Sequence, residues 1–76
     1  MSVALGTSLA DTISEAAEAN GRGDYAAELK ITRPLAAKGE AWAQAFLGDN
    51  FAFGQGVTKN YAEALKWYRL AAAQGN

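Results

Sequence analysis

The stretch Asn60–Gly75, NYAEALKWYRLAAAQG, carries the signals of one complete helix. Asn60 and Glu63 form an N-x-x-E start that can satisfy the first free backbone N–H groups, and Gly75 can adopt the left-handed conformation that ends a helix. The apolar residues fall at i, i+3, i+4, i+7, i+10 and i+11, which is the spacing of a single helical stripe: Tyr61, Ala64, Leu65, Tyr68, Ala71 and Ala72. We therefore predict a helix with both ends marked in the sequence.

The same pattern occurs earlier in the chain, over Tyr25–Gly39 (YAAELKITRPLAAKG). At an offset of 36 residues, eight of fifteen positions are identical: Tyr25/Tyr61, Ala26/Ala62, Leu29/Leu65, Lys30/Lys66, Arg33/Arg69, Ala36/Ala72, Ala37/Ala73 and Gly39/Gly75. A self-similarity of this period, carried by small and aromatic residues on a helix, indicates an array of helical hairpins rather than a unique globular core.

The composition of the chain excludes several classes of function. The 76 residues form one small domain at most, and a net charge of −1 provides no electrostatic footprint for nucleic acid and no polybasic membrane patch. No apolar run is long enough to span a bilayer. Because the chain has no cysteine and no histidine, it lacks disulfides, thiol nucleophiles and the usual zinc ligands. We predict no catalytic residue, no metal site and no cofactor.

Residues 1–10 are small and apolar, and Ser8-Leu9-Ala10 has the small-x-small form of a signal-peptidase site. The basic region that begins such signals is missing, since the first Lys or Arg is Arg22. Residues 1–10 are therefore either the remnant of an export signal or a plain leader. The first reading implies a periplasmic or secreted protein, the second a cytoplasmic one.

The remaining breaks divide residues 11–76 into four helices. A capping box at Thr12–Glu15 predicts a first helix over about residues 12–20, and Asp24 caps a second helix that ends at Gly39. Pro34 should kink this second helix near Arg33 or make it restart. A third helix follows over residues 40–53, and a glycine-rich loop pinned by Val57 leads into the fourth.

The third helix is apolar on more than one side. Ala43, Leu47 and Phe51 form one row, and Gly48 beside them removes a side chain where a neighbouring helix can come close. A second flank consists of Trp42, Ala45, Asp49, Ala52 and Phe53.

Residues 40–75 resemble a Sel1-like repeat, a relative of the tetratricopeptide repeat. About twenty positions agree in register, including the Leu-Gly pair, the Gly-x-Gly-Val loop and the Trp-Tyr pair: Ala41, Ala43, Gln44, Leu47, Gly48, Phe51, Gly54, Gly56, Val57, Asn60, Tyr61, Ala64, Trp67, Tyr68, Ala71, Ala72, Gln74 and Gly75. Residues 11–39 then form a degenerate N-terminal hairpin. In this first copy Ile31 and Thr32 replace the Trp-Tyr pair, and Pro34 interrupts the second helix of the hairpin. The implied fold is all-α: antiparallel helical hairpins stacked as an α/α superhelix, a solenoid fragment of about four helices.

The resemblance implies a non-catalytic scaffold that binds a protein or peptide. In tetratricopeptide-like arrays the first helix of each hairpin lines the inner curve, and the corresponding flank here offers Trp42 and Phe53 as apolar anchors with Asp49 between them. The alternative for this flank is packing against the first helix through Leu9, Ile13 and Ala17.

Two other functions are open. One is a cell-wall hydrolase, as proposed for some cysteine-rich relatives, although this chain has no plausible nucleophile beside a base. The other is a self-assembling fragment of a longer array. In such an array the first helix of the next unit covers the second helix of each hairpin. This sequence stops where that next helix would start, so the Trp67, Leu70 and Ala71 side of the last helix is expected to be open. A homodimer through this uncapped C-terminal helix is therefore expected.

Overall fold

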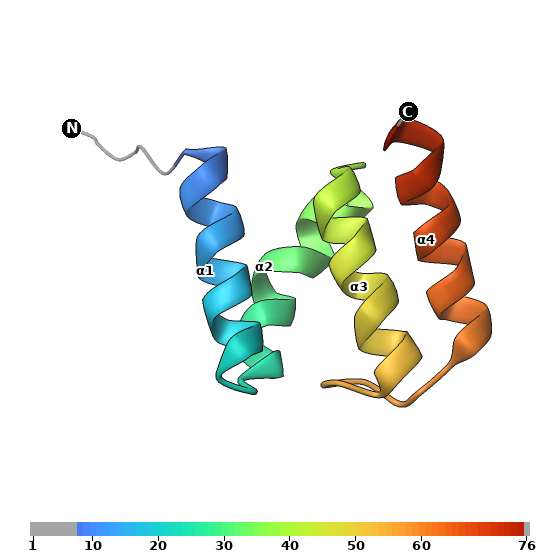
Figure 1. Cartoon of the computed structure of the whole chain (residues 1–76), viewed down its shortest axis with the longest axis horizontal. Helices are drawn as coiled ribbons and strands as arrows, with labels where there is room; N and C mark the ends of the chain where they lie inside the picture. The colour runs from blue at the N-terminus through green and yellow to red at the C-terminus, as the bar shows by residue number, and fades with distance from the viewer. Residues whose placement is uncertain (1–7, 76) are drawn as a thin grey trace.

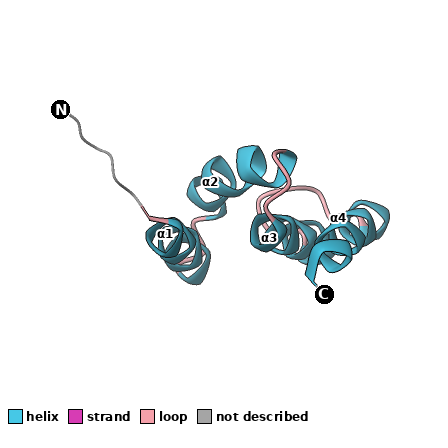
Figure 2. Ribbon diagram, turned by 90° about the horizontal axis from the view of Figure 1, so that it is seen from above, coloured by secondary structure: helices cyan, strands magenta, loops and turns pink. Residues whose placement is uncertain are grey.

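The structure, a computed structural model, describes residues 8–75. It contains four helices, α1 (Leu9–Gly21), α2 (Tyr25–Ala37), α3 (Ala41–Phe53) and α4 (Tyr61–Gly75), and no strand among the described residues. Consecutive helices run antiparallel, and the main packing joins neighbours in chain order: α1 on α2, α2 on α3 and α3 on α4 (Figures 1 and 2). The prediction of an all-α array of antiparallel hairpins is confirmed.

The first helix lies within a few residues of its predicted range, but the predicted capping box at Thr12 is wrong, because α1 begins at Leu9 and its N-cap is Ser8. The Ser8 hydroxyl accepts a 3.2 Å hydrogen bond from the Asp11 backbone N–H, whereas the Thr12 hydroxyl donates to the Ser8 carbonyl at 3.1 Å. A helix that starts one turn earlier gains backbone hydrogen bonds and places Asp11 in its first turn, where a carboxylate is favoured. Leu9 and Ala10 of the proposed leader therefore belong to α1, and its residues 1–7 lie outside the described residues.

Pro34 lies inside α2 and bends it without interrupting it. The first turns of α2 lie beside α1 and its last turns beside α3, with a change of direction between them (Figure 1). Pro34 has no N–H for the carbonyl of Lys30, and both residues are exposed, so water can replace the lost bond. The predicted kink is confirmed, and the alternative of a restarted helix is wrong.

The core is small and lies mainly between α2 and α3. Its buried apolar members are Leu29, Ala36, Ala43 and Leu47. Partly buried side chains from α2, α3, the α3–α4 loop and α4 pack around them: Leu35, Trp42, Phe51, Val57 and Trp67. The predicted role of Val57 in pinning the loop is thus confirmed.

A buried polar cluster accompanies this core. The Asn50 amide of α3 donates to Glu28 Oε1 of α2 at 2.7 Å and to the carbonyl of Gln55 at 3.0 Å. The Thr32 hydroxyl donates to Glu28 Oε2 at 2.9 Å. Glu28, Thr32 and Asn50 are all fully buried, so these hydrogen bonds replace the hydration of the Glu28 carboxylate, the Thr32 hydroxyl and the Asn50 amide nitrogen, whereas Asn50 Oδ1 has no partner among the described residues.

Gly48 permits the close approach of α3 and α4 that the sequence predicts. It is buried, and a Cβ at this position would lie 2.6 Å from both Cδ1 and Cε1 of Tyr68. Near the other end of α4, the Gln74 amide donates to the Gly39 carbonyl at 2.7 Å and to Gln44 Oε1 at 3.0 Å. These contacts hold the C-terminal half of α4 against α3 and the turn before it.

Glycine ends the helices as predicted at two places but not at a third. Gly39 and Gly54 adopt left-handed conformations, with φ of 103° and 68°. Gly75 instead remains part of α4 and is not among the glycines with positive φ. The predicted left-handed stop at Gly75 is therefore wrong in this structure, because the last turn of α4 continues through it.

Candidate interaction surface

The structure does not gather the predicted inner-curve residues into one exposed grip. Trp42 is half-buried, packs on the core cluster and meets the Phe46 ring edge to face at 5.5 Å. Phe53 is the last residue of α3 and is 66% exposed. Trp42 and Phe53 are eleven positions apart, which corresponds to about 16 Å along the helix axis. Packing of Trp42 against α1 is not a main contact either, because α1 packs chiefly on α2.

Asp49, the charged member of that set, is already bonded within the protein. Its Oδ1 accepts a hydrogen bond from the Tyr68 hydroxyl across the α3–α4 interface. Burial of the phenol, the hydrogen bond to Asp49 and the negative charge of Asp49 together raise the pKa of Tyr68 to about 12. Asp49 therefore fixes α4 against α3, and the inner-curve grip stays a prediction in which Phe53 is the freest anchor.

The open side of α4 differs from the predicted Trp67, Leu70 and Ala71 side. Trp67 and Ala71 are half-buried, and Trp67 packs on the core cluster, so their assignment to the open side is wrong. Leu70 is 44% exposed, as expected, but its apolar neighbour on the surface is Leu65, which is 48% exposed. Trp67 lies two positions from Leu65, about 200° around the helix, and hence faces inward.

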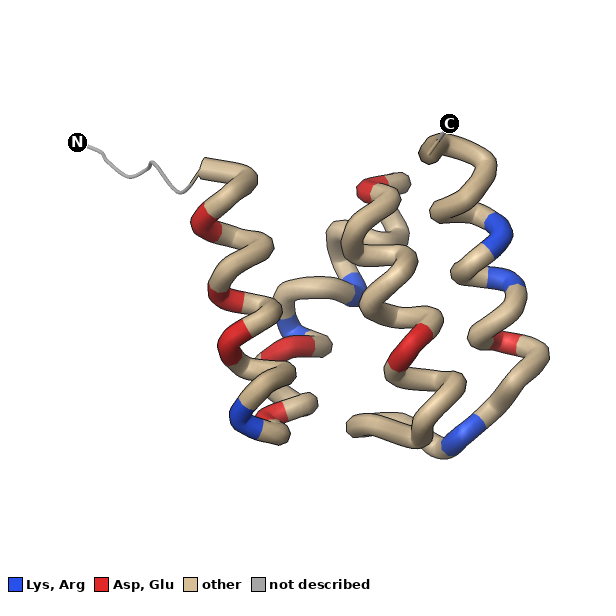
Figure 3. The backbone as a smooth tube through the Cα atoms, viewed as in Figure 1, with Lys and Arg blue, Asp and Glu red and all other residues tan. Residues whose placement is uncertain are grey.

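The exposed face of α4 forms a shallow groove of about 440 Å³, which we call the α4 groove. Its lining combines apolar and basic side chains: Ala62, Leu65, Lys66, Arg69 and Leu70. Figure 3 shows the basic residues of α4 on the outward side of the array. Around the helix, Lys66 and Arg69 lie between Leu65 and Leu70, an arrangement that suits an amphipathic protein segment that carries carboxylates.

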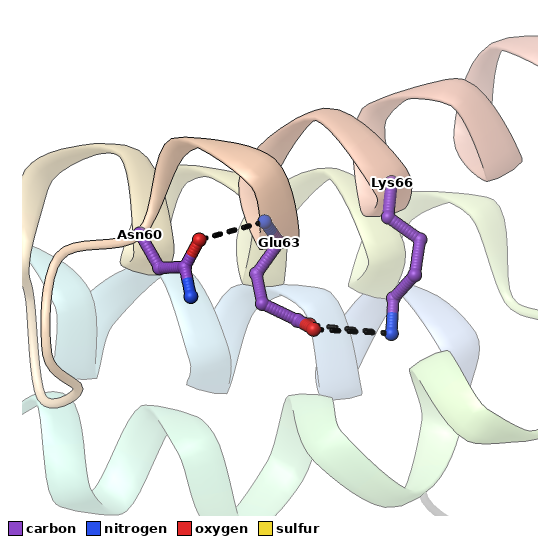
Figure 4. A network of polar contacts seen from close by, with 3 residues as sticks. All are labelled: Asn60, Glu63 and Lys66. Atoms are coloured by element: carbon purple, nitrogen blue, oxygen red, sulfur yellow. Dashed lines mark hydrogen bonds and ion pairs between the residues drawn. The ribbon is translucent and has the colours of Figure 1, made fainter.

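Local contacts position Lys66 within this groove. The Asn60 side chain accepts a 3.1 Å hydrogen bond from the Glu63 backbone N–H, and the Glu63 carboxylate pairs with Lys66 at 3.2 Å (Figure 4). The Lys66 ammonium also lies 5.0 Å from the centre of the Trp67 ring. Arg69 makes no ion pair within residues 8–75. Arg69 is thus the more available of the two cations.

The internal repeat shows what covers the equivalent face elsewhere in the same chain. Leu29 and Ala36 of α2 are only 7% and 1% exposed, because α3 and its following loop pack on them. Their equivalents on α4, Leu65 and Ala72, are exposed. The face that receives a helix on α2 is therefore unoccupied on α4.

Sequence reasoning missed Leu65, Lys66 and Arg69 as surface candidates. The signal was present in the alignment of Tyr25–Gly39 with Asn60–Gly75, which pairs Leu65 with Leu29. Assigning Leu29 to the face under the third helix would have placed Leu65 on the open face. The aromatic Trp67 drew attention to the wrong side of the same helix.

Within residues 8–75, no group of three or more acidic side chains is arranged to hold a metal ion. No helix among the described residues has the length and apolar character needed to cross a membrane.

Comparison with family models identifies the repeat. A model described as the Sel1 repeat matches residues 43–76, which cover most of α3, the α3–α4 loop and α4. Searches of curated proteins and of solved structures gave no match. Sel1 repeats generally mediate protein interactions and are typically non-catalytic. Residues 43–76 are therefore similar to a Sel1 repeat, as the resemblance of residues 40–75 predicts.

Proposed function

We propose that the protein is a non-catalytic scaffold that binds a helical protein segment in the α4 groove. The observation that carries this proposal is the difference between two equivalent leucines: Leu29 is 7% exposed beneath α3, and Leu65 is 48% exposed on α4. Burying an exposed leucine side chain favours association by about 1.5 to 3 kcal/mol when burial is complete. Covering the α4 groove, in which both Leu65 and Leu70 are exposed, would therefore favour association with a partner.

The class of partner follows from the packing of α3 on α2. That packing uses a helix with small and medium apolar residues, Ala43 and Leu47, and leaves the basic residues Lys30 and Arg33 exposed at its edge. Lys66 and Arg69 are the repeat equivalents of these two. A partner helix that also carries carboxylates would bury Leu65 and meet both cations. A second copy of this chain is one source of such a helix.

Photo-crosslinking from two positions tests the proposal. A benzoylphenylalanine in place of Leu65 should give an adduct of discrete mass in the cells that produce the protein. The same residue in place of Ala26, which is exposed on α2, is the matched control and should give none. Equal yields from both positions, or no adduct from position 65, would refute the α4 groove as an interaction surface.

A cell-wall hydrolase is the alternative function, and it requires a nucleophile beside a base. Glu28 is fully buried and bonded to Thr32 and Asn50. Asp49 is bonded to Tyr68. Turnover of wall fragments or β-lactams above a heat-killed control in a steady-state assay would overturn the non-catalytic assignment.

A further inference from the structure

The two end helices of the array carry opposite charge on their exposed faces. α1 contains three acidic residues, Asp11, Glu15 and Glu18, and no Lys or Arg, and all three are exposed. Within residues 8–75, none of them forms an ion pair. The exposed face of α4 carries Lys66 and Arg69 at the opposite end of the array (Figure 3). The molecule is therefore electrostatically polar along the direction in which its helices stack.

The exposed face of α1 also has a shape that another helix can approach closely. Its central row consists of small residues at i, i+4, i+7 and i+11, all exposed: Ala10, Ser14, Ala17 and Gly21. Leu9, which is 57% exposed, lies on one side of this row, and the acidic residues lie on the other. A row of small residues leaves space for protruding side chains such as Leu65 and Leu70.

We propose that the α4 groove receives α1 of a second copy of this chain, so that copies associate head to tail; this inference rests on the function proposed above. Leu65 would pack on the small-residue row of the second copy, and the acidic residues beside that row would meet Lys66 and Arg69, which lie on one side of Leu65 around α4. Leu29, the repeat equivalent of Leu65, is likewise covered by the next helix along the chain, α3.

Charge distinguishes this occupant from a second α4. A twofold contact between two α4 helices would bring Lys66 and Arg69 of both copies together, and like charges at an interface oppose association. α3 supplies few carboxylates for such a groove, since its only acidic residue, Asp49, is bonded to Tyr68. α1 supplies three. Because the two surfaces in a head-to-tail contact differ, the association is heterologous and extends beyond a dimer.

Sedimentation of the full chain, combined with variants at each end, tests the arrangement. The α1 variant is Glu15→Lys with Glu18→Lys, and it keeps Asp11 because a carboxylate in the first turn stabilises α1. The α4 variant is Leu65→Gln with Leu70→Gln. Wild-type protein should show a mass that rises with concentration past twice 8.0 kDa and falls with added salt. For each variant alone, the dissociation constant for self-association should rise by at least about tenfold.

Mixing the two variants is the decisive measurement. The mixture should form a one-to-one dimer and nothing larger, because only the α4 groove of the first variant and the α1 face of the second remain intact. Lys30→Glu with Arg33→Glu, the repeat equivalents on α2, is the matched control for charge and should associate like wild type. Circular dichroism confirms that every variant is helical.

Contrary outcomes separate this inference from the proposed function. Normal self-association of the α1 variant, with loss in the α4 variant, would overturn the head-to-tail arrangement in favour of a twofold α4 contact and leave the α4 groove as an interaction surface. A wild-type chain that remains monomeric into the millimolar range would overturn self-association. The absence of a crosslinked adduct from position 65 is the separate result that would overturn the proposed function itself.

Discussion

The Asn50 amide donates a 2.7 Å hydrogen bond to Glu28 across the α2–α3 interface, where both side chains are fully buried. Removing the donor leaves Glu28 Oε1 without this hydrogen bond at a site that water does not reach. We expect Asn50→Ala to lower the free energy of unfolding by about 3 kcal/mol, measured by urea denaturation.

A second Asn→Ala substitution serves as the control for this change. Asn60 is exposed and caps α4 through a single hydrogen bond to the Glu63 N–H. Asn60→Ala should cost about 1 kcal/mol, as expected for loss of a helix cap. Equal losses for the two substitutions would show that the buried bond to Glu28 adds nothing to stability.

Gly48 sets the distance between α3 and α4. Gly48→Leu should destabilise the protein by about 1 to 3 kcal/mol, because the Tyr68 ring occupies the space that the new side chain needs. Gly48→Ala should also destabilise it, since even a Cβ would lie 2.6 Å from two ring atoms. Gly21→Ala provides the comparison, because nothing lies within 4 Å of a Cβ there. A neutral Gly48→Leu variant would mean that α3 and α4 are packed differently.

Tyr68 makes stability depend on pH at the alkaline end. Its pKa is raised from 10.0 to about 12 in the folded protein, so the folded state holds the phenolic proton more tightly than the unfolded state. This contribution to stability is complete below pH 10 and is lost as the pH rises through about 12. Thermal denaturation over that range should show the decline, and Tyr68→Phe should lack it.

Asp49→Asn separates the causes of the raised pKa of Tyr68. Burial is the largest cause, and the hydrogen bond and charge of Asp49 add to it. The substitution should therefore lower the pKa of Tyr68 without returning it to the ordinary value of 10.0. Tyrosinate absorbance, assigned to Tyr68 by difference from Tyr68→Phe, measures this. An unchanged titration would contradict the contact between the two side chains.

Substitutions at Gly56 and Gly23 separate two causes of destabilisation, backbone strain and steric clash with neighbouring side chains. Both have φ of 78°, so alanine is strained equally at either position. At Gly56 a Cβ would also lie 2.7 Å from Leu29 Cδ1 and 2.8 Å from Tyr25 Cβ, whereas nothing lies within 4 Å at Gly23. Gly56→Ala should therefore destabilise the protein more than Gly23→Ala in thermal denaturation. Equal effects would show that the α3–α4 loop does not press on α2.

The sequence predicted helix order and close approaches better than exposed faces. Local signals sufficed for Asp24, Gly39 and Gly48, because a cap, a helix-ending glycine and a missing side chain act within a few residues. Which side of the last helix is open depends on where α3 lies, and periodicity alone did not separate Leu65 from Trp67.

The polar bridge between Glu28 and Asn50 was also beyond sequence reasoning. The two residues are 22 positions apart and lie on different helices, and each residue type is ordinarily exposed. Glu28 has no counterpart in the second copy, where the equivalent position is Ala64. The bridge depends on tertiary packing that no local pattern records.

Each helix packs mainly on its neighbours in chain order, and this packing determines how fast the molecule folds and where it unfolds first. The main interhelical contacts join helices that are adjacent in the chain, so only short loops must close to form them and folding is expected to be rapid. α1 packs chiefly on α2, where its buried residues are Ala16 and Ala19. Its amide protons should exchange with solvent before those of α3, which is packed on both sides. Opening then begins at the acidic end of the array and proceeds inward, one helix at a time.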